Sequence, residues 1–247
     1  MKLPLPIAEG QLVKRYKRFF ADVKLDDEVV TAHVPNTGSL KSCLNENALC
    51  RMSYHDNPKR KLKYTLQMIK TPTSWVGVNT SLPNVLVWEA WERKDLWPKL
   101  PFAKREVKIS KETRLDMALW QKDYGLGPKK KIDLENFDKY KFHFVEIKNV
   151  TFRDGEKALF PDSVTTRGQK HLRELMELKR QGHKSEIFFV VQRTDCQIFS
   201  PADDIDPEYG RLLRQAKKEG VTISAYACKM LKDKISLDCN APLKIIL

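Results

Sequence analysis

The stretch "KFHFVEIKNVT", Lys141 to Thr151, decides how the second half of this chain folds. Its phenylalanine, valine and isoleucine residues predict a buried strand, yet Glu146 and Lys148 lie within it. Charged side chains are rarely buried unless they are paired or bind something. Alternate residues of a strand share a face, so Glu146 and Lys148 lie on one face, roughly 7 Å apart at about 3.3 Å per residue. We expect the functional site on that face.

The residues that follow predict a strand–helix–strand unit. "FPDSVTTRGQKHLRELMELKRQG", residues 160–182, carries a helix, for which Thr166 is the predicted N-cap, Gln169 completes a capping box, and Gly182 is the stop. "SEIFFVVQ", residues 185–192, is a continuous apolar run typical of a central strand covered on both faces. Strand, helix and strand in this order predict a right-handed βαβ crossover.

Further elements extend this pattern in both directions. "DPEYGRLLRQAKKEG" predicts a helix from Asp206 to Gly220, and a strand follows over 221–230. Upstream, "TRLDMALW" (113–120) predicts a strand with Leu115, Met117 and Leu119 on one face and Asp116 with Ala118 on the other. A helix is predicted within "VNTSLPNVLVWEAWERKDL" (78–96), with Leu86 and Ala90 inward. Residues 83–247 are therefore predicted to form an α/β domain with a mixed sheet.

Residues 1–82 have a different character. Short strand-like runs separated by polar turns predict a small all-β barrel or sandwich. Between Arg51 and Lys70 there are six lysines or arginines and the single acid Asp56, and aromatic residues alternate with such charges. This favours a platform for single-stranded nucleic acid. The alternative is that the aromatic residues belong to the core and the lysines only solubilise the surface.

The composition limits the function classes. The chain has 247 residues, 41% hydrophobic and 31% charged, with a formal net charge of +13, which suggests a polyanionic partner. No apolar run approaches the roughly 20 residues that span a bilayer, and the N-terminus has no secretory pattern. We therefore expect a soluble, cytoplasmic protein with no membrane partner. The five cysteines form no C-x-x-C pair and are expected to be reduced and buried. Phosphate-loop, serine-hydrolase and zinc-protease motifs are absent.

The acidic residues of the predicted sheet point to metal chemistry. Two carboxylates on adjacent strands, Asp116 and Glu146, would form a hard oxygen site for Mg²⁺ or Mn²⁺ that can activate water toward a phosphodiester. Lys148 would stabilise developing charge or assist deprotonation, and Glu89 on the preceding helix could complete the metal shell. The alternative is a buried Asp–Lys–Glu ion network without a metal.

Six motifs in order resemble one family. "RYKRFFADV", "AHVPNTGSL", "VNTSLPNVLVWEA", "TRLDMAL", "FVEIKNVT" and "FPDSVTTRGQKHLREL" together are similar to the sugar fermentation stimulation protein A (SfsA) family, from about Val13 to the C-terminus. The resemblance implies an N-terminal OB-fold-like barrel followed by a domain like the PD-(D/E)xK nucleases. In that alignment Asp116, Glu146 and Lys148 match the core positions, and Glu89 matches a helix glutamate that many members carry.

The resemblance also suggests a nucleic-acid surface and two functions. Arg167 and Gln169 lie where such nucleases place groups near the scissile phosphate. With the basic residues of the barrel, the expected nucleic-acid-binding set is Arg15, Lys17, Arg18, Lys59, Arg60, Lys61, Arg167 and Gln169. One function is a metal-dependent nuclease. The other is a non-enzymatic DNA-binding regulator of sugar (maltose) catabolism, and the family is described mainly as binding DNA without strong sequence preference.

Several points stay open at this stage. The substrate could be single- or double-stranded DNA or RNA, and an oligomer is compatible with the sequence. The segment "KDYGLGPKKKIDLENFDKYK", residues 122–141, departs from the family as an insert between Asp116 and Glu146. It is expected to be a mobile loop that either closes over nucleic acid or is a tolerated surface insertion.

Overall fold

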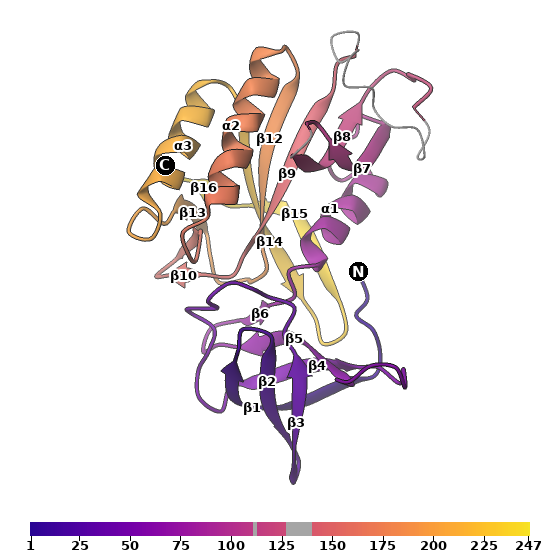
Figure 1. Ribbon diagram of the computed structural model, residues 1–247, viewed down its shortest axis with the longest axis vertical. Coiled ribbons are helices and arrows are strands. Elements are labelled where there is room, and N and C mark those ends of the chain that lie inside the picture. Colours follow the sequence, from indigo (N-terminus) through magenta and orange to yellow (C-terminus); the bar gives the residue numbers. More distant parts are fainter. Residues whose placement is uncertain (111–112, 127–139) are drawn as a thin grey trace.

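Six short strands form the N-terminal part of the protein, shown at the bottom of Figure 1. In this computed structural model, which describes residues 1–110, 113–126 and 140–247, they pair in the order β3-β2-β1-β4-β5-β6. A parallel pairing between β3 and β5 closes β1 to β5 into a barrel. The strands are β1 (Ile7–Tyr16), β2 (Phe20–Leu25), β3 (Glu28–His33), β4 (Leu49–Tyr54), β5 (Tyr64–Lys70) and β6 (Trp75–Gly77).

The first two strands form a hairpin. The turn between them holds Lys17 and Arg18 with φ of 46° and 62°, in the left-handed region that reverses the chain tightly. The barrel core is one cluster of small and aliphatic side chains, among them Val23, Leu66 and Val76. A closed barrel of this kind and the α/β part that follows confirm the predicted fold class.

The second part is built on a six-stranded mixed sheet. Its order is β15-β14-β12-β9-β8-β7, in which β9, β12 and β14 are parallel and the outer strands pair antiparallel. The strands are β7 (Phe102–Lys108), β8 (Arg114–Trp120), β9 (His143–Val150), β12 (Lys184–Val191), β14 (Thr222–Met230) and β15 (Ile235–Pro242). A small sheet beside it contains β10 (Arg153–Asp154), β11 (Lys157–Phe160), β13 (Ile198–Pro201) and β16 (Lys244–Ile245).

Helices cover the two faces of the large sheet unequally. Helices α2 (Thr166–Arg180) and α3 (Pro207–Lys218) pack on one face, and α1 (Leu82–Glu92) packs on the other (Figure 1). The first face buries residues such as Phe144, Leu172 and Leu213, and the second buries Val145 and Leu86. Helix α1 covers only part of its face of the sheet, and residues 95–100, which follow the helix, lie beside the rest of that face.

Two local predictions need correction. The N-cap of α2 is Thr165, whose side chain accepts a hydrogen bond from the backbone N–H of Gly168, so the helix begins one residue earlier than expected. On β8, Met117 and Leu119 share a core cluster, but Leu115 packs in the other. The regular alternation breaks next to Glu106 of the partner strand, whose φ of 53° interrupts the pairing between β7 and β8.

All five cysteines are free and four are buried. The prediction of a mobile loop at 122–141 falls mostly on residues that lie outside the described ranges. Within the described chain, no helix combines the length and apolar character required to cross a membrane.

Candidate active site

The site begins where strands β8 and β9 separate. Their antiparallel pairing runs from Leu119 and His143 to Met117 and Val145. At the next position the backbone pairing stops. There Oδ2 of Asp116, and not a backbone carbonyl of β8, accepts the hydrogen bond from the backbone N–H of Ile147, at 2.7 Å. Its Oδ1 accepts a hydrogen bond from Nδ2 of Asn84, on α1, also at 2.7 Å. The carboxylate is thus held in a fixed orientation at the end of the ladder.

Glu146 on the neighbouring strand is almost fully buried, with 4% of its surface exposed. Its Oε1 pairs with Nζ of Lys148 at 2.7 Å and also contacts Nδ1 of His171 on α2. The predicted common face of Glu146 and Lys148 is therefore present. The other oxygen, Oε2, is buried and has no hydrogen-bond donor among the described residues. A buried carboxylate oxygen without a partner is costly unless something binds it.

The two carboxylates differ in acidity. Burial raises the pKa of Glu146, but the charges and hydrogen bonds of Lys148 and His171 outweigh burial, and the pKa is lowered overall. Burial, reinforced by repulsion from Glu146, raises the pKa of Asp116 to about 7, despite the hydrogen bonds from Ile147 and Asn84. Two carboxylates whose environments separate their pKa values are typical of functional sites.

Three cationic or polar groups line one side of this pair. Nζ of Lys148 lies 3.1 Å from Nδ1 of His171, and Nε of Arg167 donates to Nε2 of His171 at 3.4 Å. With Nδ1 facing Glu146 and Nε2 accepting from Arg167, the ring links the buried carboxylate to the exposed first turn of α2. Arg167 is thereby held at the edge of the site.

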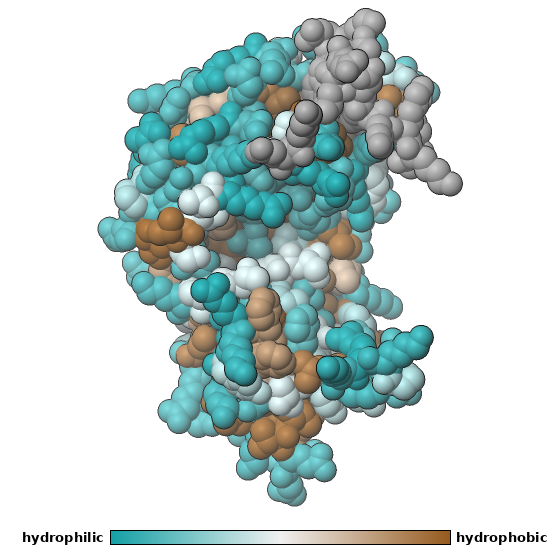
Figure 2. All heavy atoms as spheres, viewed as in Figure 1, coloured by the Kyte–Doolittle hydropathy of each residue, from teal (hydrophilic) through white to brown (hydrophobic). Residues whose placement is uncertain are grey.

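A cavity of about 540 Å³ opens above these groups. Asp116, Glu146, Lys148 and His171 line it from the α/β part, with Arg167 at the start of α2. Residues of the barrel complete it: Arg18, Asn36, Thr37 and Gly38. The cavity is therefore formed by both parts of the molecule, which meet where the space-filling view narrows in Figure 2. It lies at the carboxyl end of the parallel strand β9, on the side of the sheet where ligands bind in open α/β folds.

The barrel loop over the cavity is held in place from both sides. From the barrel, the guanidinium of Arg15 donates to the carbonyl oxygens of Arg18, Asn36, Gly38 and Ser39 at 2.8–3.1 Å. From the other side, Oδ2 of Asp162 accepts the backbone N–H groups of Ser39 and Leu40 at 2.8 and 3.3 Å. A Cβ atom at Gly38 would lie 2.5 Å from Oδ2 of Asp162, so any other residue there would displace the carboxylate that holds the loop.

Not every residue that is expected to bind nucleic acid lies at the cavity. Arg18 and Arg167 line it. Arg15 instead supports the loop described above, and Gln169 donates through Nε2 to the carboxylate of Asp206, which caps α3. The remaining four belong to the barrel surface: Lys17, Lys59 and Lys61 are exposed, and Arg60 donates to Leu62 O and Thr65 Oγ1.

The structure does not bring Glu89 to the two carboxylates. Its Oε2 lies 2.6 Å from the amino group of Met1. Asn84 supplies the α1 contact to Asp116 instead. Five residues along a helix rotate the side chain by about 140° relative to Asn84, so the two cannot face the same strand.

Three contributors were not anticipated from the sequence. His171 is 5% exposed and Asn84 and Asp162 are half-buried. Of these three, only His171 could have been found from the sequence, because it occupies an inward position of the apolar stripe of α2, next to Leu172 and one turn before Leu175. A polar residue on the inner face of a helix points to a buried partner.

The donor set fits a hard divalent cation. Two carboxylates border a polar cavity, and the unpartnered Oε2 of Glu146 is a ready ligand atom. No three His, Cys, Asp or Glu side chains of the described residues are arranged around a metal position, so further ligands must come from backbone, water or substrate. This is the pattern in which Mg²⁺ is usually held, by one or two carboxylates with waters and phosphate oxygens.

Comparison with known proteins covers both parts of the chain. Residues 13–78 match the family profile described as the SfsA N-terminal OB domain, and residues 81–234 match that of the sugar fermentation stimulation protein RE domain. A sugar fermentation stimulation protein homologue of Bdellovibrio bacteriovorus is 50% identical, over 99% of this chain and 100% of that protein. A homologue of Geobacter sulfurreducens is 46% identical over 98% of each chain.

A solved structure of the same family supports the architecture. The structure of Pyrococcus furiosus SfsA in complex with Ca²⁺ is 26% identical, covers 100% of both chains and superposes with a TM-score of 0.79.

Proposed function

The chain belongs to the SfsA family, and from this premise we propose that it binds DNA without sequence specificity and cleaves phosphodiester bonds with Mg²⁺ or Mn²⁺ at Asp116 and Glu146. The observation that carries the proposal is the carboxylate pair of half-buried Asp116 and buried Glu146, whose Oε2 is unpartnered among the described residues, facing a cavity lined by Lys148, Arg18 and Arg167. The Ca²⁺ complex of the Pyrococcus protein supports a cation site in the family.

The residues around the pair have separable roles in this proposal. Asp116 and Glu146 would hold the ion, which when bound polarises a phosphoryl oxygen and increases the acidity of a bound water. Lys148 lies beside Glu146 and would stabilise negative charge that develops on the phosphate. His171 contacts both Lys148 and Glu146 and so holds them in position. Arg167, in the N-terminal turn of α2, would contact a neighbouring phosphate.

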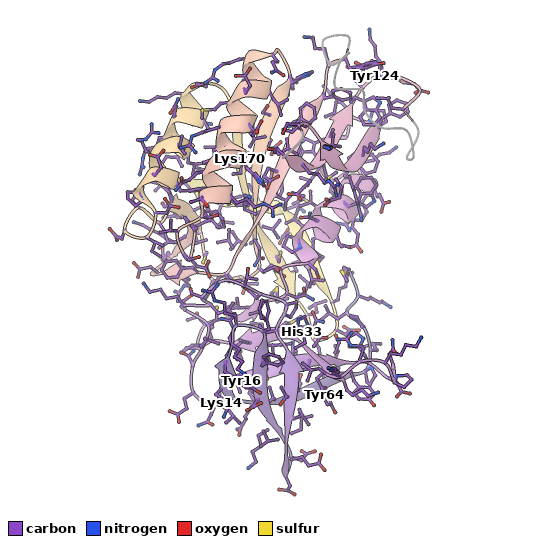
Figure 3. The ribbon with its side chains drawn as sticks, viewed as in Figure 1. Lys14, Tyr16, His33, Tyr64, Tyr124 and Lys170 are labelled. Atoms are coloured by element: carbon purple, nitrogen blue, oxygen red, sulfur yellow. The ribbon has the colours of Figure 1, made fainter. Side chains whose placement is uncertain are left out.

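The barrel would hold the strand that enters the cavity. On β1 and β2, the rings of Tyr16 and Phe20 stack at 5.5 Å, and Nζ of Lys14 lies 5.6 Å from the centre of the Tyr16 ring. Lys14, Tyr16, His33 and Tyr64 appear together on the barrel in Figure 3. Aromatic rings interleaved with cations suit stacked bases and phosphates. We therefore favour single-stranded DNA as the partner, with RNA as a second substrate to be tested.

Cleavage assays with labelled single- and double-stranded DNA and RNA, with Mg²⁺ or Mn²⁺, test the proposal. We expect metal-dependent cutting by the wild type, reduced at least a hundredfold in Asp116→Ala and Glu146→Ala. Glu177→Ala is the matched control, since Glu177 also precedes a lysine by two residues but lies exposed on α2. Calorimetric titration with Mn²⁺ should show binding to the wild type and to the control, but not to the two site variants.

A second function fits one observation. Lys148 and His171 already contact Oε1 of Glu146, as they would in a structural polar cluster of a DNA-binding regulator of sugar catabolism. In that case the wild type binds DNA without cutting it under any metal, and Asp116→Ala and Glu146→Ala bind DNA as tightly as the wild type. That pattern would contradict the nuclease proposal.

A further inference from the structure

A second cavity lies on the opposite face and at the opposite end of the large sheet. It measures about 740 Å³, within the range of ligand pockets. It is bordered by the first residues of the parallel strands β9, β12 and β14, on the α1 side that a single helix covers incompletely. The segment after α1, residues 95–100, forms its other wall. None of its lining residues belongs to the site described above.

The floor of this cavity carries a buried carboxylate. Glu186 is 3% exposed, and its Oε2 accepts a hydrogen bond from Nε1 of Trp97 at 3.1 Å and lies 2.8 Å from Nε2 of His143. Among the described residues no side chain donates to its other oxygen, Oε1, which is not one of the fully buried unpartnered atoms and so faces the open space of the cavity. A carboxylate so deeply buried, with one oxygen left for another partner, is a feature that a purely structural wall does not require.

The position of Trp97 is held against a conformational cost. Its φ of 46° lies in the left-handed region, which is rare and strained for a bulky residue. The strained backbone places the indole edge-on to the rings of His143 and Phe188, both at 5.7 Å. Phe188 in turn stacks on Tyr226 at 5.2 Å with an interplanar angle of 8°. The cavity thus has an aromatic wall directly beside the carboxylate.

The rim of the cavity is positively charged. Lys99, Lys179 and Lys184 line it, and none pairs with a carboxylate of the described residues. The one acidic residue on the rim, Asp95, is already paired with Arg93 at 2.9 Å. Three lysines disfavour a cationic ligand. A suitable ligand has a neutral planar group that donates a hydrogen bond to Glu186 and, at its other end, an anionic group that contacts the lysines.

We propose that this cavity binds a nucleoside monophosphate whose base carries an amino group. The base would lie along the indole of Trp97 with its amino group donating to Oε1 of Glu186, and the phosphate would contact the lysine rim. Stacking on aromatic rings together with hydrogen bonding of the base edge is how proteins read a base outside a helix. The site is separate from the proposed cleavage site and does not depend on it.

Nuclear magnetic resonance titration with guanosine 5′-monophosphate tests the proposal on the full chain. We expect saturable shifts of the Trp97 indole N–H and of the amides of Ser185 and Glu186, while those of Gly38 and Ile147 stay unchanged. Uridine 5′-monophosphate, whose base lacks the amino group, should bind at least tenfold more weakly. Glu186→Gln should weaken binding of the guanosine nucleotide at least tenfold, whereas Glu177→Gln on the exposed face of α2 should not.

Ser224→Trp provides a variant that leaves the buried carboxylate intact. Ser224 lies half-buried on the cavity wall, and an indole there would fill the space and abolish binding. Both variants are to be checked by thermal unfolding. Absence of saturation with the guanosine nucleotide, equal affinity for the uridine nucleotide, unchanged affinity in Ser224→Trp, or shifts centred on Gly38 and Ile147 would each overturn the proposal.

Discussion

Single residues in this protein owe their chemistry to partners that lie far away in the sequence. Asp116 and Glu146 are both carboxylates on adjacent strands, yet the pKa of Glu146 is lowered by Lys148 and His171 while that of Asp116 is raised to about 7 by burial and by Glu146. A divalent ion between them would favour the charged form of both. The difference in acidity therefore follows from Lys148 on β9 and His171 on α2, which both contact the carboxylate of Glu146 and do not hydrogen-bond Asp116.

A buried arginine near the junction of the two parts gives a prediction at the same scale. Arg193 is 1% exposed, pairs with Asp195 at 2.6 Å and donates to the carbonyl oxygen of Thr151 at 2.7 Å. Burial raises the pKa of Asp195, but hydrogen bonds from Arg193 and Thr73, with the charges of Arg193 and Arg153, lower it to about 2. Removal of the carboxylate leaves a buried charge without its partner.

Asp195→Asn should therefore lower the free energy of unfolding by about 3 kcal/mol at pH 7. Because the pKa is lower in the folded state, the carboxylate stabilises the protein above the unfolded pKa of about 4, and this contribution is lost as the pH falls toward 2. The variant should accordingly lose less stability than the wild type between pH 4 and pH 2. Urea unfolding at several pH values measures both effects, and parallel pH profiles would contradict the assignment.

Elements are defined here by their first residues as much as by their apolar faces. Helix α2 carries Arg167 and His171 to the cavity, so its starting point sets the geometry of the site. Two threonines precede it, and the capping side chain is Thr165, not Thr166. Gln169 serves a different purpose and joins α2 to the cap of α3 through Asp206.

Thr165→Ala should destabilise the protein by about 1 kcal/mol, because the N–H of Gly168 loses its acceptor. Thr166→Ala is the matched control: Thr166 is exposed in the first turn and its replacement should change stability by less than about 0.5 kcal/mol. Chemical denaturation of both variants distinguishes the two threonines. A larger loss of stability in Thr166→Ala than in Thr165→Ala would identify Thr166 as the N-cap, as the sequence predicts.

On the scale of the whole molecule, the barrel and the α/β part form one binding surface. Arg18 and the loop at 36–39 meet α2 and β9 over the cavity, and Asp162 and Arg15 fix that loop from opposite sides. The basic residues Lys59 and Lys61 lie on the exposed surface of the barrel. With a net charge of +13, association with nucleic acid should be driven by counterion release.

Affinity for single-stranded DNA should fall about fiftyfold between 50 and 200 mM salt if roughly four phosphates are neutralised. Replacing Lys59 and Lys61 together by alanine should reduce the slope of log K against log salt by about 1.4, since each phosphate contact with a single strand contributes about 0.7. Lys217 and Lys218, exposed at the end of α3, are the matched control pair and should leave the slope unchanged. Fluorescence anisotropy over a salt series gives both slopes; a flat wild-type series would rule out the electrostatic account.

The sequence by itself determined the order of the elements, the barrel followed by the mixed sheet, and the common face of Glu146 and Lys148. Those features follow from periodicity and from turn and cap residues, which act over a few positions along the chain. Only the tertiary structure decided that Asn84 and not Glu89 reaches Asp116, that His171 completes the pair, and that Arg15 supports a loop. Each of these depends on how far a helix has rotated, or on how two parts distant in sequence meet, and the local pattern of residues carries neither quantity.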